Sequence, residues 1–540
     1  MSHVLREYAA DLKREFQGYH RGALYRDTLS GITVAAVALP LALAFGVGSG
    51  ADAAAGLITA ILSAFVISAL SGASFQISGP TGAMTAILIP LVARYGLHTL
   101  FAASFLAGIL LLLAGFFRLG RLVYFLPSPV IAGFTSGIAV IIALGQVGNF
   151  FGVSLVGENA LGRVYRGLVE APSLNFYAAG IGLFVIVLMI VWPKEWNKRV
   201  PSSLVGVVAA TALATLFHLP VETVGAIPQT LIHSSHFTLG DLPRIQLDVI
   251  FLPALSIAVL CMIESLLCGA AGGRMKGERM NADRELLAQG LGNMLLPFFG
   301  GVPATAAIAR TSVAIKSGAQ TRMTGILHGV VLLLSMFLLS PLMSRIPMAA
   351  LAGVLMMTAW RMNDWKSIHY LFFRRFKGGI SKFVLTMLTT VLFDLTIAIA
   401  VGVLFSIALF IVKISNLQVS VSELDSEQLG ATAQVRRHIQ VIYITGAVFF
   451  GSLEQLESGL SKADGEVLVI SMRGVPFLDT SAVSFLLEYC QARQDEGVSV
   501  LFSSIQPSVR VMLDRAGITD VIGPGAYYLN AKDAILSQID

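Results

Sequence analysis

The chain has 540 residues, of which 55% are hydrophobic and only 13% are charged. Soluble domains contain about 25% charged residues, so this composition excludes an ordinary soluble enzyme and indicates an integral membrane protein. The formal net charge of +5 does not indicate nucleic-acid binding, because the basic residues lie in short connections between apolar segments, and three cysteines cannot make a disulfide framework.

The first 27 residues are charged and amphipathic, and they lack the apolar core and cleavage site of a signal sequence. Apolar runs then recur through residues 28–414, which we expect to form the transmembrane domain of about fourteen segments. The predicted segments are 28–48, 52–71, 80–94, 97–117, 127–150, 173–193, 202–217, 250–272, 286–300, 303–315, 323–343, 347–360, 380–396 and 397–414.

Basic residues gather in every second connection between these segments. The positive-inside rule places such connections in the cytoplasm, on the same side as the basic N-terminal residues. An even number of crossings then returns the C-terminus to the cytoplasm. The basic connections contain Arg118 and Arg121, Lys194 to Arg199, Arg274 to Arg284, Lys316 and Arg322, and Arg374 to Lys382.

Two predicted segments, 80–94 and 303–315, are short for a full crossing, and they begin at Pro80 and Pro303 after small, glycine-containing stretches. Short, Gly/Pro-interrupted segments in corresponding places of two halves indicate an inverted-repeat transporter with its site near the membrane midplane. Helix N-termini expose unpaired N–H groups and a partial positive charge, so two that face each other would bind a small anion. The alternative is that the two prolines only kink packed helices.

The gap between two such helix ends would be lined by small or apolar residues. Small residues also allow ordinary tight packing between helices, so each of them alone indicates little. The candidates are Ala42, Phe45, Thr81, Gly82 and Ala304.

Two ionisable residues lie inside predicted segments, where an unpaired charge is costly. Arg310 would add fixed positive charge beside the anion, unless its side chain extends to the cytoplasmic interface near Lys316. Glu264 is the one carboxylate of its segment and is a candidate for proton coupling, because its proton affinity would change as an anion arrives. The alternative is a static Glu264–Arg310 pair that only neutralises charge.

The composition changes after residue 414, and we expect a linker at 415–434 and a small α/β domain at 435–540. Runs at 441–444, 467–470 and 498–502 predict strands, and runs at 481–491 and 508–516 predict helices. Asp479 or Thr480 is expected to cap the first of these helices, and Ser481 is a possible acceptor of a regulatory phosphate.

Several motifs together resemble the SulP family of anion transporters and the STAS domain attached to them, bacterial members above all. The transmembrane motifs are Ser78-Gly79-Pro80-Thr81-Gly82, Ile263-Glu264-Ser265-Leu266-Leu267, Gly290-Leu291-Gly292-Asn293 and Pro303 to Thr311; those of the tail are Leu478-Asp479-Thr480-Ser481 and Leu513-Asp514-Arg515-Ala516-Gly517.

The resemblance implies an α-helical polytopic membrane protein with a seven-plus-seven inverted repeat, divided into core and gate and followed by a cytoplasmic STAS domain. The core carries the anion past the gate in an elevator-like movement, and the protein is a homodimer in the bacterial inner membrane. The substrate-binding residues implied are Leu41, Phe45, Pro80, Thr81, Gly82, Ala304, Thr305, Ala309 and Arg310.

Departures from the family bear on substrate and coupling. Many animal relatives have glutamine where Leu41 stands and an aromatic residue where Gly82 stands, so this pocket is expected to be roomier and less polar. A sodium-coupled bicarbonate carrier of cyanobacteria has aspartate and threonine where Glu264 and Cys268 stand. Since sodium prefers oxygen ligands, Cys268 favours protons over sodium as the coupling ion.

We therefore expect a secondary active transporter of a small anion, namely a dicarboxylate, bicarbonate or sulfate, coupled to protons. The alternative is an anion exchanger or a channel-like chloride or bicarbonate conductor regulated by the STAS domain. The sequence contains no nucleophile–base arrangement and no Walker-type phosphate loop, so nothing in it indicates an enzyme. No metal or cofactor is expected. Expected partners are the anion, membrane lipid and a cytoplasmic protein bound through the STAS domain.

Overall fold

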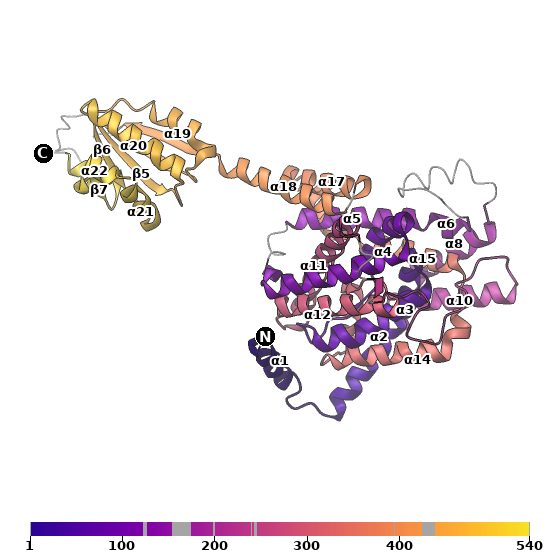
Figure 1. Cartoon of the computed structure of the whole chain (residues 1–540). Helices are drawn as coiled ribbons and strands as arrows, with labels where there is room; N and C mark the ends of the chain where they lie inside the picture. Colours follow the sequence, from indigo (N-terminus) through magenta and orange to yellow (C-terminus); the bar gives the residue numbers. More distant parts are fainter. Residues whose placement is uncertain are drawn as a thin grey trace. The chain divides into compact units, whose positions relative to one another are not determined.

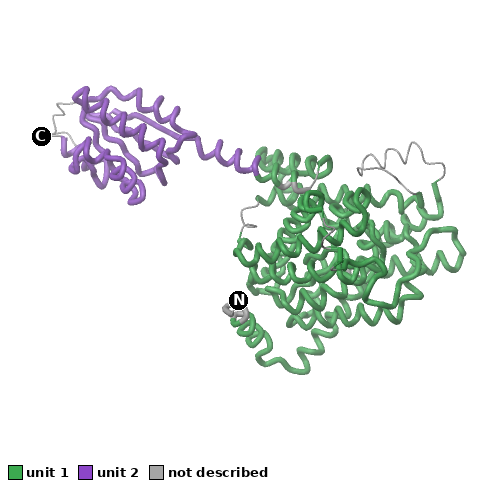
Figure 2. Tube along the Cα trace, in the orientation of Figure 1, with its two compact units in different colours: residues 1–403 green, residues 404–540 purple. Residues whose placement is uncertain are grey.

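The computed structural model describes residues 2–121, 127–153, 174–197, 200–238, 240–241, 246–393, 395–423 and 438–538. The chain divides into two compact units, residues 1–403 and 404–540, which are coloured separately in Figure 2. The boundary falls inside the last long apolar helix, α18 (Leu395–Ile414).

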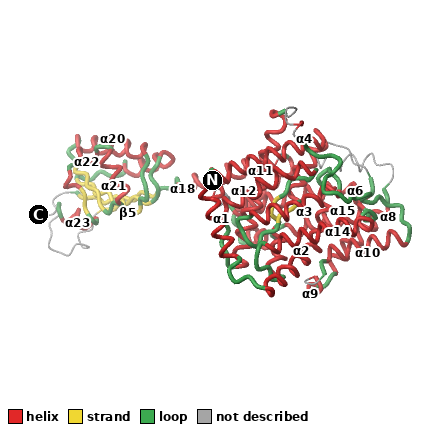
Figure 3. Tube along the Cα trace, turned by 60° about the horizontal axis from the view of Figure 1, so that its bottom comes forward, coloured by secondary structure: helices red, strands yellow, loops and turns green. Residues whose placement is uncertain are grey.

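Unit 1 is almost entirely helical, as Figure 3 shows. Its helices in chain order, most of them labelled in Figure 1, are α1 (Ser2–Glu15), α2 (Arg21–Gly48), α3 (Ala53–Leu70), α4 (Gly82–Phe116), α5 (Ser128–Gly145), α6 (Val147–Phe151), α8 (Phe176–Val191), α9 (Lys194–Asn197), α10 (Ser202–Leu216), α11 (Leu247–Lys276), α12 (Ala282–Leu295), α13 (Ile308–Lys316), α14 (Met323–Met343), α15 (Met348–Met362), α16 (Trp365–Phe373) and α17 (Lys377–Leu392).

These helices correspond closely to the predicted segments. Within the described residues, six helices are long and apolar enough to cross a membrane, and four shorter apolar helices accompany them. The predicted segments 80–94 and 97–117 form one element, α4, interrupted at Gly96, whose φ of +79° is not helical. Glycine adopts this left-handed conformation without steric cost, which explains the break at that residue.

Local sequence signals set several helix boundaries. Asp52 caps α3, because its carboxylate accepts a 2.8 Å hydrogen bond from the Ala55 amide. Asn281 caps α12 in the same way through the Arg284 amide at 3.1 Å. Gly277 ends α11 with a left-handed φ of +77°, the usual conformation of a helix-terminating glycine.

Close approaches between helices depend on glycine. A Cβ atom added to Gly108 of α4 would lie 2.7 Å from the carbonyl oxygen of Gly290 in α12, so neither position accepts a side chain there. Small residues allow such close contact between apolar helices. A continuous core of buried apolar residues runs through α2, α3, α4, α5, α11 and α15.

A two-residue ladder connects the two halves of unit 1. Strand β1 (Ser78–Gly79) pairs antiparallel with β2 (Thr305–Ala306), so that Ser78 lies opposite Ala306 and Gly79 opposite Thr305. All of these residues are buried. Helix α4 begins three residues after β1, and α13 begins two residues after β2.

Unit 2 contains a mixed sheet of described strands in the order β3-β4-β5-β6-β7. β3 pairs antiparallel with β4, and the remaining pairs are parallel. The strands are β3 (Gln418–Glu423), β4 (Ile439–Thr445), β5 (Val467–Gly474), β6 (Ser499–Ser503) and β7 (Tyr527–Tyr528); the helices are α19 (Leu453–Leu460), α20 (Thr480–Asp495), α21 (Pro507–Arg515), α22 (Ile518–Ile522) and α23 (Ala531–Leu536).

The two faces of this sheet carry separate cores, because successive strand residues point to opposite sides. Leu468 and Ile470 of β5 pack with the residues of α19, α20 and α21, whereas Val467 and Val469 pack with Ala534 of α23. The predicted strands 441–444, 467–470 and 498–502 and the predicted helices 481–491 and 508–516 are all present in β4, β5, β6, α20 and α21.

The structure differs from the predicted linker at 415–434. Its first part, Gln418–Glu423, is strand β3, and residues 424–434 lie outside the described residues. β3 is an edge strand with mostly exposed or half-buried side chains, so it lacks the apolar run that identifies a buried strand.

Candidate anion-binding site

The ladder brings the N-terminal ends of α4 and α13 together. Because β1 and β2 run antiparallel, the helices that follow them leave the ladder in opposite directions and begin close to it. Thr81 caps α4 by accepting a 3.3 Å hydrogen bond from the Met84 amide, whereas Ala307, which precedes α13, has no side chain that caps. Each end therefore presents amide groups and a partial positive charge to the space beside the ladder.

The predicted start of the second short helix was wrong. Pro303 lies five residues before α13, in an extended stretch, and the helix begins at Ile308. The stretch from Gly301 to Ala304 packs inside the protein, and β2 follows it. Pro80, in contrast, lies only two residues before the start of α4.

Arg310 is the third residue of α13, and its side chain is only 1% exposed. Its Nη2 atom donates a hydrogen bond of 2.5 Å to the carbonyl oxygen of Pro80. Among the described residues, no partner accepts a hydrogen bond from its Nη1 atom, which is also buried. Arg310 therefore does not reach the cytoplasmic interface, and it holds an unused donor beside the two helix ends.

Gly79 makes room for this guanidinium group. A Cβ atom at this position would lie 2.3 Å from Nη1 of Arg310, which no real contact allows, and 3.1 Å from its Cζ atom, which is a tight contact. The absence of a side chain at Gly79 is therefore a condition for the position of Arg310.

We predict that Gly79→Ala lowers anion uptake at least tenfold, because the new methyl group displaces the guanidinium from between the helix ends. Uptake of radiolabelled anion into proteoliposomes measures the effect. Gly378→Ala is the matched control, since an added Cβ there meets open space. Equal uptake by Gly79→Ala and wild type would show that Arg310 need not occupy this position.

Glu264 lies on α11 and is connected to the start of α4. Its Oε2 atom accepts a hydrogen bond of 2.9 Å from the hydroxyl of Thr81, the capping residue. The side chain is half-buried. Among the described residues no ion pair within 4.0 Å joins Glu264 to Arg310, although the two side chains interact electrostatically at longer range.

Phe45 and Gly82 face each other beside the start of α4. A Cβ atom on Gly82 would lie 3.1 Å from a ring carbon of Phe45 and 2.7 Å from the Ile142 side chain of α5. Leu41 is buried one turn earlier on α2, within the same apolar core. Ala309 is exposed in the first turn of α13, next to the buried Arg310.

Ala304 and Thr305 lie behind the ladder, where other groups satisfy their polar atoms. Asn293 of α12 accepts from the Ala304 amide at 2.8 Å and donates to the Ala304 carbonyl oxygen at 2.9 Å. The Thr305 hydroxyl lies 3.0 Å from that of Ser265. The structure thus gives these two residues a supporting position rather than one at a helix end.

The buried polar face of helix α12 was not predicted from the sequence. Glu285, Gln289 and Asn293 are all fully buried, and Gln289 donates 2.8 Å hydrogen bonds to both Ser78 of β1 and Glu285. Asn293 holds the chain next to β2, so this face supports both strands of the ladder. The signal is present in the sequence, because polar residues four apart inside an apolar segment share one helix face.

In unit 2, Asp479 caps α20, as expected. Its carboxylate accepts from the Ala482 amide at 2.8 Å and from the Phe450 amide at 3.0 Å. Ser481 is the second residue of this helix and is exposed.

Comparison with known proteins gives two family matches along the chain. The model of the sulfate permease family matches residues 24–377, and that of the STAS domain matches residues 431–534. The chain belongs to the sulfate permease family. The family and its relatives are transporters rather than enzymes.

The relatives of this sulfate permease family member include bacterial proteins of similar length. YvdB of Bacillus subtilis (strain 168), provisionally named a sulfate transporter, is 34% identical over 527 residues, which cover 95% of this chain and 97% of that protein. The bicarbonate transporter BicA of Picosynechococcus is 28% identical over 538 residues, with 95% and 94% covered.

Solved structures share the fold. Murine Slc26a9, an anion transporter solved in an inward-facing state, has a TM-score of 0.81 at 17% identity, with 97% of this chain and 93% of that chain covered. The transmembrane domain of a cyanobacterial BicA has a TM-score of 0.64 at 28% identity, with 72% and 98% covered. The predicted helical membrane fold with an inverted repeat and a terminal STAS domain is confirmed.

Proposed function

We propose that this protein is a secondary active transporter that binds one small anion between the N-terminal ends of α4 and α13. The observation that carries the proposal is the β1–β2 ladder, which places both helix ends beside Arg310, whose Nη1 donor has no protein partner among the described residues. A small anion would accept from this donor and from the amides of both ends. Phe45, Gly82 and Ile142 would form the apolar wall of the site.

In this proposal, Thr81 links binding of the anion to protonation of Glu264. An anion that arrives at the end of α4 meets the capping hydroxyl, which also donates to Glu264. Since two negative charges close together disfavour each other, binding of the anion favours the protonated form of Glu264. Protonation of Glu264 together with anion binding would produce proton-coupled symport, by movement of a core past a gate.

The anion is proposed to be sulfate, bicarbonate or a dicarboxylate such as fumarate or succinate. The names of the relatives support the first two. A site made from backbone amides and one guanidinium accepts all of these chemically. The side chains of Phe45 and Ile142 fill the space beside Gly82, so a larger organic dianion would require these two side chains to move.

A competition screen in proteoliposomes tests the proposal. The purified full-length protein is reconstituted, and uptake of labelled sulfate, bicarbonate and succinate is measured with and without an inward proton gradient. We expect saturable uptake of the labelled anion. Competing anions of one class should inhibit this uptake, and the inward proton gradient should increase it. Large ohmic chloride currents without saturable uptake would contradict the proposal and support the channel alternative.

The membrane arrangement is also proposed. We infer that both termini lie in the cytoplasm, on the basis of the alternating basic connections, and the family resemblance suggests a homodimer in the inner membrane. Labelling of single cysteines introduced at Ser2 and at Ser537 in intact cells tests the orientation. Reaction with a membrane-impermeant maleimide before lysis would contradict it, and a monomeric mass from light scattering in detergent would contradict the homodimer.

Ser481 is proposed as a regulatory phosphorylation site in the STAS domain, which would also bind a cytoplasmic protein. A phosphate here would lie at the N-terminal end of α20, where the helix dipole favours negative charge. We predict that Ser481→Asp changes the maximal uptake rate about twofold or more without unfolding the domain, because a charge at an N-terminus is tolerated. Ser484→Asp, another exposed serine one turn later, is the control. Equal maximal uptake rates for wild type, Ser481→Asp and Ser484→Asp would contradict a regulatory role for Ser481.

A further inference from the structure

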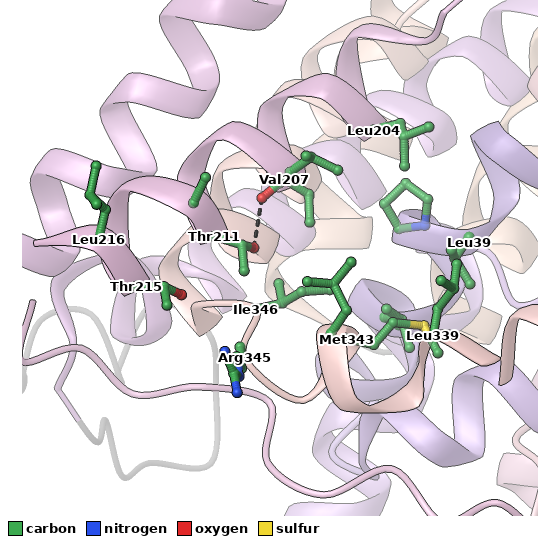
Figure 4. A pocket seen from close by; sticks show the side chains of 15 residues that line it. Leu39, Leu204, Val207, Thr211, Thr215, Leu216, Leu339, Met343, Arg345 and Ile346 are labelled. Atoms are coloured by element: carbon green, nitrogen blue, oxygen red, sulfur yellow. Dashed lines mark hydrogen bonds between the residues drawn. The ribbon is translucent and has the colours of Figure 1, made fainter. Parts of the chain in front are cut away.

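A hollow lies in unit 1, between helix α2 and helix α10. It has a volume of about 510 Å³, and the structure places it among α2, α10 and the C-terminal end of α14 (Figure 4). We call it the α2–α10 groove. Its lining residues are Leu39, Pro40, Leu43, Leu204, Val207, Val208, Thr211, Ala212, Thr215, Leu216, Leu339, Leu342, Met343, Arg345 and Ile346.

The walls of the α2–α10 groove are almost entirely apolar. The hydroxyl of Thr211 donates to the Val207 carbonyl oxygen at 2.7 Å, as the dashed line in Figure 4 shows, so it offers no donor to a ligand. Val208, Leu216 and Leu342 are large apolar residues more than half exposed at the rim. In a membrane helix, exposed apolar residues face lipid, so the groove opens toward the hydrocarbon of the bilayer.

Arg345 supplies the one cation among the lining residues. It lies in the short connection between α14 and α15, immediately after the apolar part of the groove, and its side chain is exposed. No ion pair or hydrogen bond of its side chain is found among the described residues. An apolar groove with a cation that makes no ion pair among the described residues at the edge of an apolar segment matches a molecule with a hydrocarbon chain and an anionic head.

We propose that the α2–α10 groove binds an anionic glycerophospholipid, with one acyl chain along Leu43, Val207 and Met343 and the phosphate against Arg345. A peptide does not fit this surface, because its backbone N–H and C=O groups would find no partners on apolar walls within the membrane. A zwitterionic lipid fits less well, because its positive headgroup opposes Arg345.

The lipid would contact the helix that carries the predicted site residues. Leu39, Pro40 and Leu43 line the groove, and Leu41 and Phe45 lie on the same stretch of α2. Pro40 lies inside this helix and removes one backbone hydrogen bond, which makes the helix easier to bend at that point. Where the proposed transport function holds, lipid in the groove changes the transport rate through α2.

Native mass spectrometry of the full-length protein in detergent tests lipid binding directly. The protein is titrated with phosphatidylglycerol, which is anionic, and with phosphatidylcholine, which is zwitterionic. We expect one phosphatidylglycerol molecule per chain to bind about fivefold more tightly than phosphatidylcholine. Arg345→Gln should remove this preference while weak binding of both lipids survives.

A second variant fills the groove without a change of charge. Ala212 is an exposed lining residue, so Ala212→Phe adds a ring that occupies the hollow rather than the core, and it should lower binding of both lipids at least fivefold. The matched controls are Arg94→Gln and Ala93→Phe, an exposed arginine and alanine of α4 that do not line the groove, and both should bind as wild type.

The results distinguish this proposal from the transport proposal. Equal binding of both lipids by wild type, or an unchanged preference in Arg345→Gln, overturns the headgroup site. Unchanged binding in Ala212→Phe overturns the acyl-chain site. The binding readout does not depend on transport activity, so failed uptake in proteoliposomes leaves it interpretable.

Discussion

Arg310→Ala is expected to reduce anion uptake at least about 100-fold and to weaken anion binding by a similar factor. The substitution removes the buried guanidinium next to both helix ends and leaves the Pro80 carbonyl oxygen without its partner. In the proposed complex, Arg310 and the bound anion form a buried charge pair. Removal of one member of such a pair costs about 3–5 kcal/mol, which corresponds to more than 100-fold in affinity. Binding is measured by titration calorimetry in detergent, and uptake is measured in proteoliposomes.

Two controls distinguish a variant that no longer binds the anion from a variant that no longer folds. Arg310→Lys keeps the charge but not the planar pair of donors, so it should show intermediate affinity. The thermal unfolding of the purified variants is measured in parallel, and a single cooperative transition shows that each variant is folded. Wild-type affinity in a folded Arg310→Ala protein would place the anion elsewhere.

Glu264→Gln is expected to abolish the dependence of uptake on a proton gradient while anion exchange survives. Glutamine has nearly the same shape, and its side-chain oxygen still accepts the hydrogen bond from Thr81, so the capped start of α4 is preserved. It cannot bind or release a proton at physiological pH. With one proton per anion, a gradient of one pH unit drives about tenfold accumulation, and this factor should fall to one in the variant.

Glu285→Gln is the matched control for this experiment. Glu285 is a fully buried carboxylate that accepts hydrogen bonds from Ser71, the Gly72 amide and Gln289, and it makes no hydrogen bond to Thr81. Its replacement should lower stability and leave proton dependence intact. Proton-driven accumulation that persists in Glu264→Gln would assign the coupling proton to another group.

Most of the helical fold was predictable because it follows from long apolar runs. A bilayer requires about 20 apolar residues per crossing, and such runs are visible without any knowledge of contacts. Helix boundaries at Asp52 and Asn281 follow from capping chemistry. The edge strand β3 was not predictable in the same way, because six residues with polar alternation resemble a linker.

The site itself was only partly predictable. The two-residue strands β1 and β2 have no pattern of their own, so neither their pairing nor the delay of α13 until Ile308 follows from the sequence. Proline favours the first turn of a helix, but Pro303 is equally compatible with the extended chain that the structure shows. The contact between Thr81 and Glu264 joins residues 183 apart in the chain, and only tertiary packing determines it.

The ladder between β1 and β2 has a consequence for the affinity of the site on the two sides of the membrane. Its backbone pairing and the hydrogen bond from Arg310 to the Pro80 carbonyl oxygen hold the N-terminal ends of α4 and α13 together as one unit. Where the proposed transport function holds, a unit that keeps its shape presents the same binding groups to an anion from either compartment. Anion binding to protein held open to one side or to the other should therefore show the same dissociation constant.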